Sequence, residues 1–536
     1  MSTGTTPEPI HSDPHSYGLV LLTLCLGFFM TVLDVTIVNV AVPEMINSLS
    51  ISFSQTLWVL NAYTLTFTAL LLFSGRLGDL LDPRRLLIGG LTIFTLASAA
   101  CGAAHTPWQL ITARSVQGLG AACLMPQTLS LLTTLTPLDR RGRAFGTWGA
   151  IAGVALVAGP TIGGLLVTWL DWRWIFLVNL PVGGATILLA LRCLPPGRKR
   201  RRSRPDLLGV GLSSAALFCL TFGIIEGQHY HWGPISGPIS IPVLLAAGGT
   251  LWAVFLWAEQ RAAAADPLLP RELRRQRTFT IMNLVTALMM FALAALLLMM
   301  TLYLQSVRGM SALAAGLTIS PTPLVAVLLS PLVGQATGRG RNTQLTLILG
   351  LLVVTGGLLW LRSITHTNTD ATALLPALLV MGAGMSLVLA PMNALTMHGI
   401  PTHLAGAASG LVSTSRQLGT TIGVAAVGAL LENRLAHAIP SAVHEHSRDV
   451  PAQLRPALDQ AFSDPGDLAD RLGLVSAGSQ QQPGPDPTTA AQLHEVYRAT
   501  FSDAFIDALH STLLLPSALL LLAAVITLTV RPPHSA

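Results

Sequence analysis

Residues 159–163 are GPTIG, and residues 419–423 are GTTIG, 260 positions further along the chain. A second pair of segments has nearly the same spacing: GRLGDLLDPRR begins at Gly75, and GQATGRGR begins at Gly334, 259 positions later. The members of each pair occupy matching places relative to the apolar segments around them. Two matches at nearly one spacing indicate that the chain contains a duplicated unit.

The composition is that of a membrane protein. Hydrophobic residues make up 51% of the 536 residues and charged residues only 10%, whereas a soluble domain has about 25% charged residues. The apolar residues form separate stretches, many of which reach the roughly 20 residues that a membrane-spanning helix needs. Because isolated strands cannot satisfy their backbone groups in lipid, the sequence predicts an all-α polytopic membrane protein.

Fourteen helices are expected, and the duplication indicates how they are divided between two halves. Their predicted ranges are 17–42, 56–75, 86–104, 108–135, 144–170, 174–194, 207–228, 239–258, 279–304, 312–333, 343–361, 371–392, 404–431 and 509–530. Six such helices need roughly 200 residues with their connections, so the observed spacing leaves room for two more between the copies. We therefore predict a 6+2+6 layout in two pseudo-repeat halves, with a binding site near the midplane between the halves.

Positive charge orients these helices. Most arginines, including the RKRRRSR run at 198–204, fall on one side when the helices alternate across the membrane. The positive-inside rule makes that side the cytoplasm and places both termini there. The run could also contact nucleic acid or anionic lipid, but orientation explains it without a partner. The predicted parts are a tail at 1–16, a six-helix bundle at 17–194, two inserted helices with basic linkers at 195–278, helices nine to thirteen at 279–431, an extracytoplasmic loop at 432–508, a last helix at 509–530 and a tail at 531–536.

Asp34 is the most informative residue because it interrupts an otherwise apolar segment, LDVTIVNVAVP at 33–43. A carboxylate in mid-membrane costs about 2.5–3.5 kcal/mol to insert, so such residues normally face a cavity or a partner. Asp34 lies about 25 Å from the cytoplasmic start of its helix, and Arg114 about 9 Å from the outer start of its own. Both therefore fall in the outer half of the membrane and could pair. Gln117 shares a helix face with Arg114.

The pairing allows two interpretations. An acid balanced between desolvation and a nearby arginine can bind a proton in one conformation and release it in another. The alternative is a purely structural ion pair, or an Arg114 side chain that extends outward to the interface. Further polar candidates for the proton and substrate pathway are Asn39, Asn61 and Glu226. The second half offers Arg416 and Gln417, and Arg416 is expected to be either a second buried charge or a contact between the halves.

Several motifs identify the chain as a member of the major facilitator superfamily by resemblance, and of its fourteen-helix drug:proton antiporter branch (EmrB/QacA type). GRLGDLLDPRR resembles the superfamily's GxLxDRxGRR loop, although Asp82 and Pro83 depart from that pattern. The resemblance implies an inner gate formed by Gly75, Asp79, Arg84 and Arg85. We expect Gly75 to permit a tight turn or close helix approach, and Asp79 to lie at a helix N-terminus and to pair with Arg84 and Arg85. The second copy has Gly338 where the acid should be, so the gate is expected in the first half alone.

Two more motifs support the resemblance. RSVQGLG from Arg114 is similar to the RxxxG motif that the superfamily links to proton transfer, and DWRWIFLVNLPVG at 171–183 is typical of the branch. The latter suggests an interfacial anchor. The segment from Gly153 through GPTIGG resembles the antiporter motif that marks exporters; its residues are Gly153, Gly159, Pro160, Gly163 and Gly164.

The resemblance implies proton-coupled export of amphiphilic or cationic drug-like compounds across a bacterial inner membrane, by a monomer that uses protons and no cofactor or metal. Alternatives are export of a specific metabolite, such as an endogenous antibiotic, a siderophore or an amino acid, an uptake symporter, and a nontransporting sensor. A membrane enzyme would need a catalytic cluster, and the sequence offers none. The chain also has no GxxxxGK(S/T) loop, so ATP is not expected to drive it directly.

Overall fold

The computed structural model describes residues 14–49, 53–137, 140–196, 206–227, 229–230, 232–261, 267–336, 341–446 and 487–530. Its elements are α1 (Pro14–Leu49), α2 (Phe53–Leu80), α3 (Pro83–Gly102), α4 (Pro107–Leu135), α5 (Arg141–Trp169), α6 (Trp174–Leu177), α7 (Asn179–Cys193), α8 (Leu207–Glu226), β1 (Pro234–Ser236), β2 (Ile239–Ser240), α9 (Ile241–Arg261), α10 (Arg271–Arg275), α11 (Arg277–Leu302), the π-helix η1 (Tyr303–Val307), α12 (Ala312–Ile319), α13 (Pro321–Ala336), α14 (Arg341–Ile364), α15 (Ala371–Thr396), the 3₁₀ turn η2 (Thr402–Leu404), α16 (Ala405–His446), α19 (Pro487–Thr512) and α20 (Leu514–Leu528).

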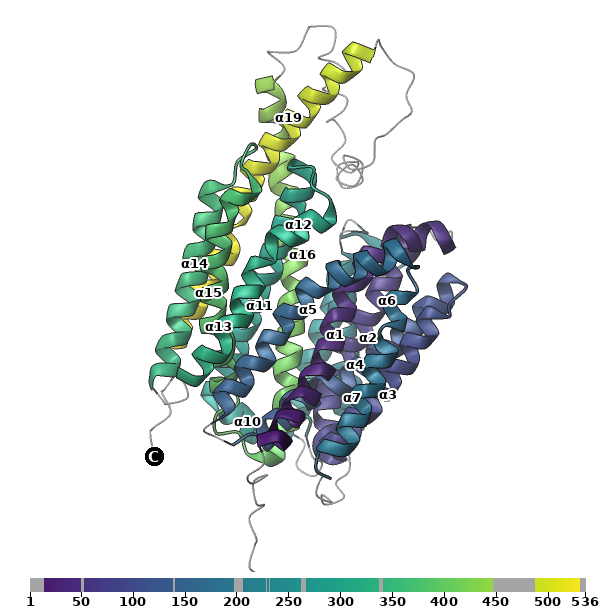
Figure 1. The fold of residues 1–536 in the computed structure, drawn as a ribbon, viewed down its shortest axis with the longest axis vertical. Coiled ribbons are helices and arrows are strands. Elements are labelled where there is room, and N and C mark those ends of the chain that lie inside the picture. The colour runs from purple at the N-terminus through teal and green to yellow at the C-terminus, as the bar shows by residue number, and fades with distance from the viewer. Residues whose placement is uncertain are drawn as a thin grey trace, which may run out of the picture.

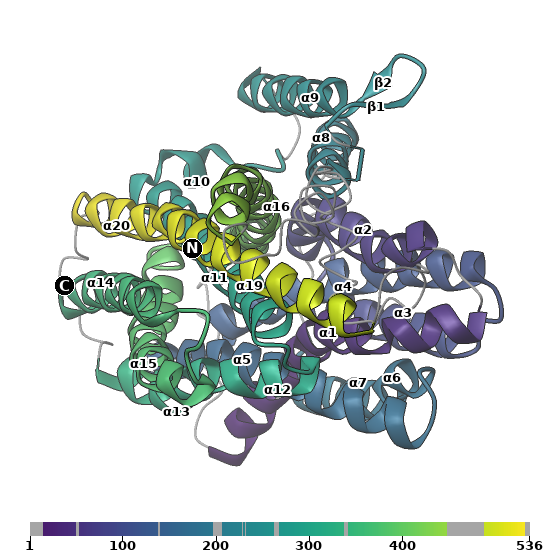
Figure 2. The same ribbon diagram turned by 90° about the horizontal axis from the view of Figure 1, so that it is seen from above.

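The helices form two bundles that lie side by side (Figure 1). The first contains α1–α7, and the second contains α11–α16 with α19 and α20. Helices α8 and α9 pack against each other outside both bundles, and α8 also contacts α2 and α16 (Figure 2). Thirteen helices in the described ranges are long and apolar enough to cross a membrane, and the 29-residue α5 runs beside α1 and α13. The predicted all-α membrane architecture is confirmed.

Glycines from the sequence repeat make equivalent contacts in the two bundles. Gly159 packs α5 against Thr36 of α1, so closely that a Cβ atom there would overlap the threonine side chain. Gly419, its counterpart in the repeat, packs α16 against the backbone of Ala287 in α11. Small residues at such crossings let helix backbones approach closely. The duplicated motif therefore has the same packing function in each bundle.

The two bundles meet at the end where α1 begins. We call this end the basic end because it has Arg84, Arg85, Arg140, Arg141 and Arg143 at or next to the helix termini there. Two crossings of glycine on glycine join the bundles at this end.

The first crossing joins α2 to α16, where a Cβ atom on Gly75 would lie 2.5 Å from the Cα atom of Gly410. In the second, Gly334 of α13 lies against the backbone of Gly142 in α5. Gly75 and Gly334 are the residues that begin the second pair of repeated segments, so the repeat also places the contacts between the bundles.

Two sequence expectations are corrected. The helix predicted at 404–431 continues as α16 to His446, so the segment predicted as a loop from residue 432 begins in a helix. Apolar periodicity did not mark this extension, because α16 becomes polar where it continues beyond the membrane-length core. Within the same segment the sequence also allows short helices near 451–472 and 488–509: α19 confirms the second, and the first lies outside the described residues. The strands β1 and β2, which the sequence did not predict, form a small antiparallel hairpin before α9.

The second correction concerns the segment that begins at Gly75. It was expected to be a loop, but α2 continues to Leu80, and only Leu81 and Asp82 separate α2 from α3. Gly75 therefore makes no turn; it permits close approach of α16 from inside a helix. The Asp82 side chain accepts the backbone N–H of Arg84 and so caps the N-terminus of α3. This contact gives a structural role to the aspartate that departs from the family pattern.

Candidate functional site

Asp34 and Arg114 form an ion pair in the centre of the first bundle, as predicted. Nη1 of Arg114 donates to Oδ2 of Asp34 at 2.5 Å, and Nε2 of Gln117 donates to Oδ1 at 2.8 Å. Nη1 of Arg114 also donates to Oε1 of Gln117 at 2.7 Å. The carboxylate is completely buried, as is the Gln117 side chain. The three residues satisfy one another's hydrogen bonds inside the bundle, away from solvent.

A second layer of residues holds this group, and the sequence analysis did not identify them as site residues. Ser98 of α3 accepts a hydrogen bond from Gln117 at 2.7 Å and another from Asn179 of α7 at 3.0 Å. The ring of Tyr63 lies 4.4 Å from the Arg114 guanidinium carbon, in cation–π contact. Asn179 lies in the segment that we interpreted as an interfacial anchor, but it is 2% exposed. An asparagine in an apolar run was the signal that could have identified it.

The remaining polar candidates of the first bundle lie elsewhere. Asn39 is exposed and donates to the carbonyl of Val35 on its own helix. It is not part of the hydrogen-bonded group around Asp34. Nδ2 of Asn61 donates to Oε1 of Glu226 at 2.8 Å. This contact joins α2 to α8, one of the two helices outside the bundles.

A cavity of about 250 Å³ lies between the two bundles, next to the buried ion pair. Its wall is mostly apolar; the lining side chains include Phe28, Phe67, Met290, Leu293 and Met385. Tyr63 also lines it, whereas Asp34 does not. In this conformation the Asp34 carboxylate is separated from the cavity. A proton and a ligand in the cavity therefore do not compete directly for it. Arg416 and Gln417 of α16 complete the wall.

A second cavity of about 440 Å³ continues from the first toward the end opposite the basic end. Val35, Gln417 and Thr420 line both cavities. Asn61 lines the second one, and so does Glu432. Together the two cavities form a path between the bundles that leads away from the glycine crossings.

Asp79 closes the basic end by capping a helix of the other bundle. Its Oδ1 accepts the backbone N–H of Gly406 at 2.9 Å, and its Oδ2 accepts that of Ala407 at 2.7 Å. Both N–H groups belong to the first turn of α16, so they have no hydrogen-bond partner within that helix. The helix dipole also favours a negative charge at this place. Arg76 lies 3.7 Å from the same carboxylate, which is 4% exposed. The predicted position of Asp79 at the N-terminus of a neighbouring helix is confirmed.

The expected arginine partners of Asp79 are wrong. Nη2 of Arg84 donates to the carbonyl of Leu191 at 2.6 Å, and Nε of Arg85 lies 3.9 Å from Asp82. Both arginines follow the turn into α3 and so point away from Asp79 on the preceding helix. Arg76, one helical turn before Asp79, is the arginine that reaches it. Gly338, which replaces the acid in the second copy, lies outside the described residues.

The residues of the antiporter motif differ in what they contact. Gly153 packs against the Pro323 carbonyl in the other bundle, with only 2.9 Å available for a Cβ atom. Gly159 and Gly163 pack against α1, whereas a Cβ atom on Gly164 would meet nothing within 4 Å. Pro160 lies within α5, and its side chain is outside the described residues. Three of the four glycines therefore serve close packing, and Gly164 does not.

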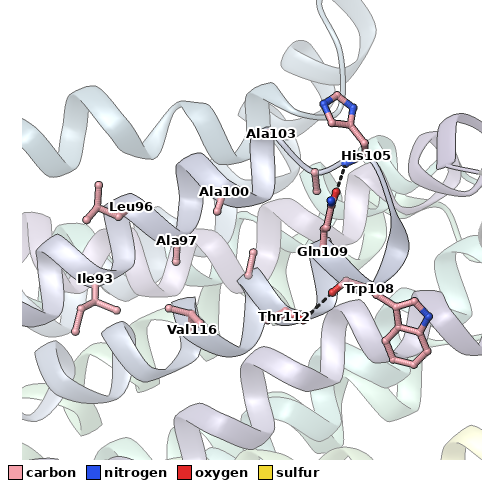
Figure 3. A pocket seen from close by; sticks show the side chains of 12 residues that line it. Ile93, Leu96, Ala97, Ala100, Ala103, His105, Trp108, Gln109, Thr112 and Val116 are labelled. Carbon is pink, nitrogen blue, oxygen red and sulfur yellow. Dashed lines mark hydrogen bonds between the residues drawn. The ribbon is translucent and has the colours of Figure 1, made fainter.

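A larger groove of about 770 Å³ lies between α3 and α4, away from the ion pair (Figure 3). Its lining is mostly alanine and aliphatic side chains, with His105 and Gln109 at one end. Two of the lining side chains, Leu96 and Trp108, are 66% and 68% exposed. An apolar outer face of this kind is normal for a protein in lipid. The size of the groove alone does not indicate a binding or catalytic function.

Similar proteins share both the sequence pattern and the fold. The sequence profile of the Major Facilitator Superfamily matches residues 24–424. The chain belongs to the major facilitator superfamily. Among its relatives is the multidrug resistance protein Stp of Mycobacterium tuberculosis, which is 35% identical over 80% of this chain and 80% of that protein. The tetracenomycin C resistance and export protein of Streptomyces glaucescens is 31% identical, over 82% of each chain.

The fold is also found in solved structures. The proton:xylose symporter XylE superposes with a TM-score of 0.57 at 12% identity and covers 97% of both chains, which is a likeness of fold alone. Family membership establishes that this protein is a multi-pass membrane transporter of small molecules and not an enzyme.

Proposed function

We propose that this transporter exports amphiphilic drug-like compounds in exchange for protons, as a monomer in a bacterial inner membrane with both termini in the cytoplasm. It is assigned to the fourteen-helix drug:proton antiporter branch, with α8 and α9 as the two helices between six-helix halves. The observation that supports this best is the completely buried Asp34 carboxylate beside an apolar cavity between the bundles. The names of the two relatives are consistent with export.

The geometry suggests how protons are coupled to transport. Protonation of Asp34 removes the negative charge that balances Arg114, and the two hydrogen bonds that the carboxylate accepts change with it. Since Tyr63 touches Arg114 on one side and lines the cavity on the other, a shift of the guanidinium reaches the cavity wall directly. Asp34 then acts on the substrate through Tyr63 and not by direct contact.

The alternating step is assigned to the basic end. In this state the glycine crossings and the Asp79 cap close that end, and the cavities lead toward the other. Opening the basic end requires α2 and α16 to separate. A proton that enters down the gradient supplies the energy, at about 2.3 kcal/mol per charge for each 100 mV.

The test uses purified protein in liposomes with an imposed pH gradient and a neutral amphiphilic dye such as Nile red. We expect uphill dye transport that an uncoupler stops and that Asp34→Asn abolishes. Asp171→Asn is the matched control, because Asp171 is 43% exposed and pairs with Arg173 outside the site. If Asp34→Asn still moves dye uphill, the proton site lies elsewhere, with Glu226 as the next candidate. If the wild type moves no dye but moves one metabolite, the specific-exporter alternative replaces this proposal.

A further inference from the structure

Arg416 is the only charged residue among the described residues that line the first cavity between the bundles, that of about 250 Å³. Its Nη2 donates to Oδ1 of Asn393 at 2.6 Å, and its guanidinium carbon lies 4.9 Å from the ring centre of Trp148. Its Nε is enclosed and has no hydrogen-bond partner among the described residues. A guanidinium has five N–H donors, so most of its hydrogen-bonding capacity is unused.

The charge of Arg416 is also unbalanced. No carboxylate of the described residues comes within 4.0 Å of its guanidinium. Arg114 is different, because Asp34 neutralises it at 2.5 Å. Leaving a charge unpaired in apolar surroundings is costly, and buried charges are normally paired. The cavity that Arg416 lines is a place from which a counter-charge can reach its guanidinium.

The acidic residues nearest to the path are badly placed for this. Glu432 follows Arg416 on α16 by 16 residues, which is about 24 Å of helix rise. Glu226 is bonded to Asn61 beside the second cavity. Asp34 is completely buried and is already held by Arg114 and Gln117.

We propose that Arg416 binds an anionic group, a carboxylate or an ionised phenol or enol, on the molecule that this protein exports. The apolar part of that molecule would lie against the aromatic and methionine side chains of the cavity, such as Phe28 and Met290. An arginine pairs with a carboxylate through two parallel hydrogen bonds, which a cation cannot form. This inference rests on the proposed export function and replaces the sequence-based expectation of cationic substrates.

The proposal has an electrical consequence. For one proton that enters, export of a cation moves no net charge, export of a neutral molecule moves one charge inward, and export of a monoanion moves two. Transport of an acidic substrate should therefore respond to membrane potential more steeply than transport of a neutral one through the same protein.

The experiment compares fluorescein, an anion, with rhodamine 123, a cation on the same xanthene scaffold, and with neutral Nile red. Wild type, Arg416→Gln, Arg416→Lys and Arg275→Gln are assayed in liposomes with a pH gradient. Arg275→Gln is the matched control because Arg275 is an exposed arginine at the end of α10 and does not line the cavity. We expect wild type to export fluorescein, and Arg416→Gln to raise its half-saturating concentration about tenfold or more. Arg416→Lys should retain most of the fluorescein transport, and Arg416→Gln should lower the transport of Nile red far less than that of fluorescein.

Two results would overturn the proposal. The first is an equal loss of anionic and neutral dye in Arg416→Gln, which would make Arg416 a contact between the bundles through Trp148. The second is a wild type that exports rhodamine 123 but not fluorescein. Neither result affects the export function itself, because transport of the neutral dye under a pH gradient tests that separately.

Discussion

The carboxylate of Asp79 accepts the backbone N–H of Gly406 at 2.9 Å, although the two residues are 327 positions apart and belong to different bundles. Asp79 thus fixes the first turn of α16 to the last turn of α2. Hydrogen bonds from backbone N–H groups to a carboxylate are stronger than neutral ones and depend on the charge. The contact can exist only while the basic end is closed, because it spans the two bundles.

Asp79→Asn tests this contact. The amide keeps the size of the side chain but loses the charge and one of the two acceptor atoms, so the closed basic end should lose about 1.5–3 kcal/mol. We expect transport to fall at least tenfold. A cysteine in place of Ser409, completely buried in this state, should react faster with a maleimide in this variant when the native cysteines have been replaced. Unchanged labelling together with lost transport would mean that Asp79 acts in some other step.

Gly75→Ala tests the closure of the basic end by changing the shape of the helix crossing there, without changing a charge. The new methyl group would lie 2.5 Å from the Gly410 Cα atom, so the helices have to separate. Overpacking of this kind typically costs about 1–3 kcal/mol. Gly89→Ala is the matched control, since nothing lies within 4 Å of a Cβ atom there. We expect the Gly75 variant alone to show reduced transport and increased maleimide labelling at position 409; equal effects of the two variants would contradict the crossing as a gate.

The sequence predicted the depth of residues better than their direction. Counting helix rise placed Asp34 and Arg114 in the same half of the membrane, and the structure pairs them. The same counting could not show that Asn39 lies outside the hydrogen-bonded group of Asp34, because depth says nothing about which side of a helix a residue occupies.

The sequence also could not predict contacts in which the partner of a side chain is a backbone atom. The groups that hold Asp79 are N–H groups of α16, which have no side-chain signature. Only the general preference of carboxylates for helix N-termini pointed to them, and it could not say which helix. The arginines after the turn were a false signal because they are close to Asp79 in sequence but follow it into another helix.

The buried ion pair can be tested by a double-mutant cycle. Asp34→Asn leaves Arg114 uncompensated, which should reduce the free energy of unfolding by about 3–5 kcal/mol. Adding Arg114→Gln removes the orphaned charge and should restore much of that stability without restoring uphill transport. Thermal unfolding of the four proteins in detergent measures the first effect, and dye transport under a pH gradient measures the second. Additive losses of stability would show that the two side chains do not depend on each other in the folded protein.

The glycines of the antiporter motif allow a comparison within one helix. Gly159→Ala should disturb the packing of α5 on Thr36 and lower both stability and transport, whereas Gly164→Ala should be tolerated because its Cβ atom would meet nothing within 4 Å. We expect a stability difference of about 1–3 kcal/mol between the two variants. Expression level, thermal unfolding and dye transport distinguish them. If both substitutions abolish transport and leave folding intact, the motif has a function in export beyond the packing of α1 against α5.

Glu226→Gln tests whether Glu226 is a proton site in addition to Asp34. The glutamine can still accept the hydrogen bond from Asn61 through its carbonyl oxygen, so the contact between α2 and α8 should persist. Because Glu226 lies beside the second cavity and is not part of the Asp34 group, we expect transport of a neutral dye to change by no more than about threefold, which is under 1 kcal/mol. The pH dependence of transport should stay that of the wild type. Asn61→Ala is the complementary variant, since it leaves the Glu226 carboxylate without its donor and should cost more than removing the charge. Loss of uphill transport in Glu226→Gln, with downhill transport preserved, would instead make Glu226 a second proton site and add a titrating group to the cycle.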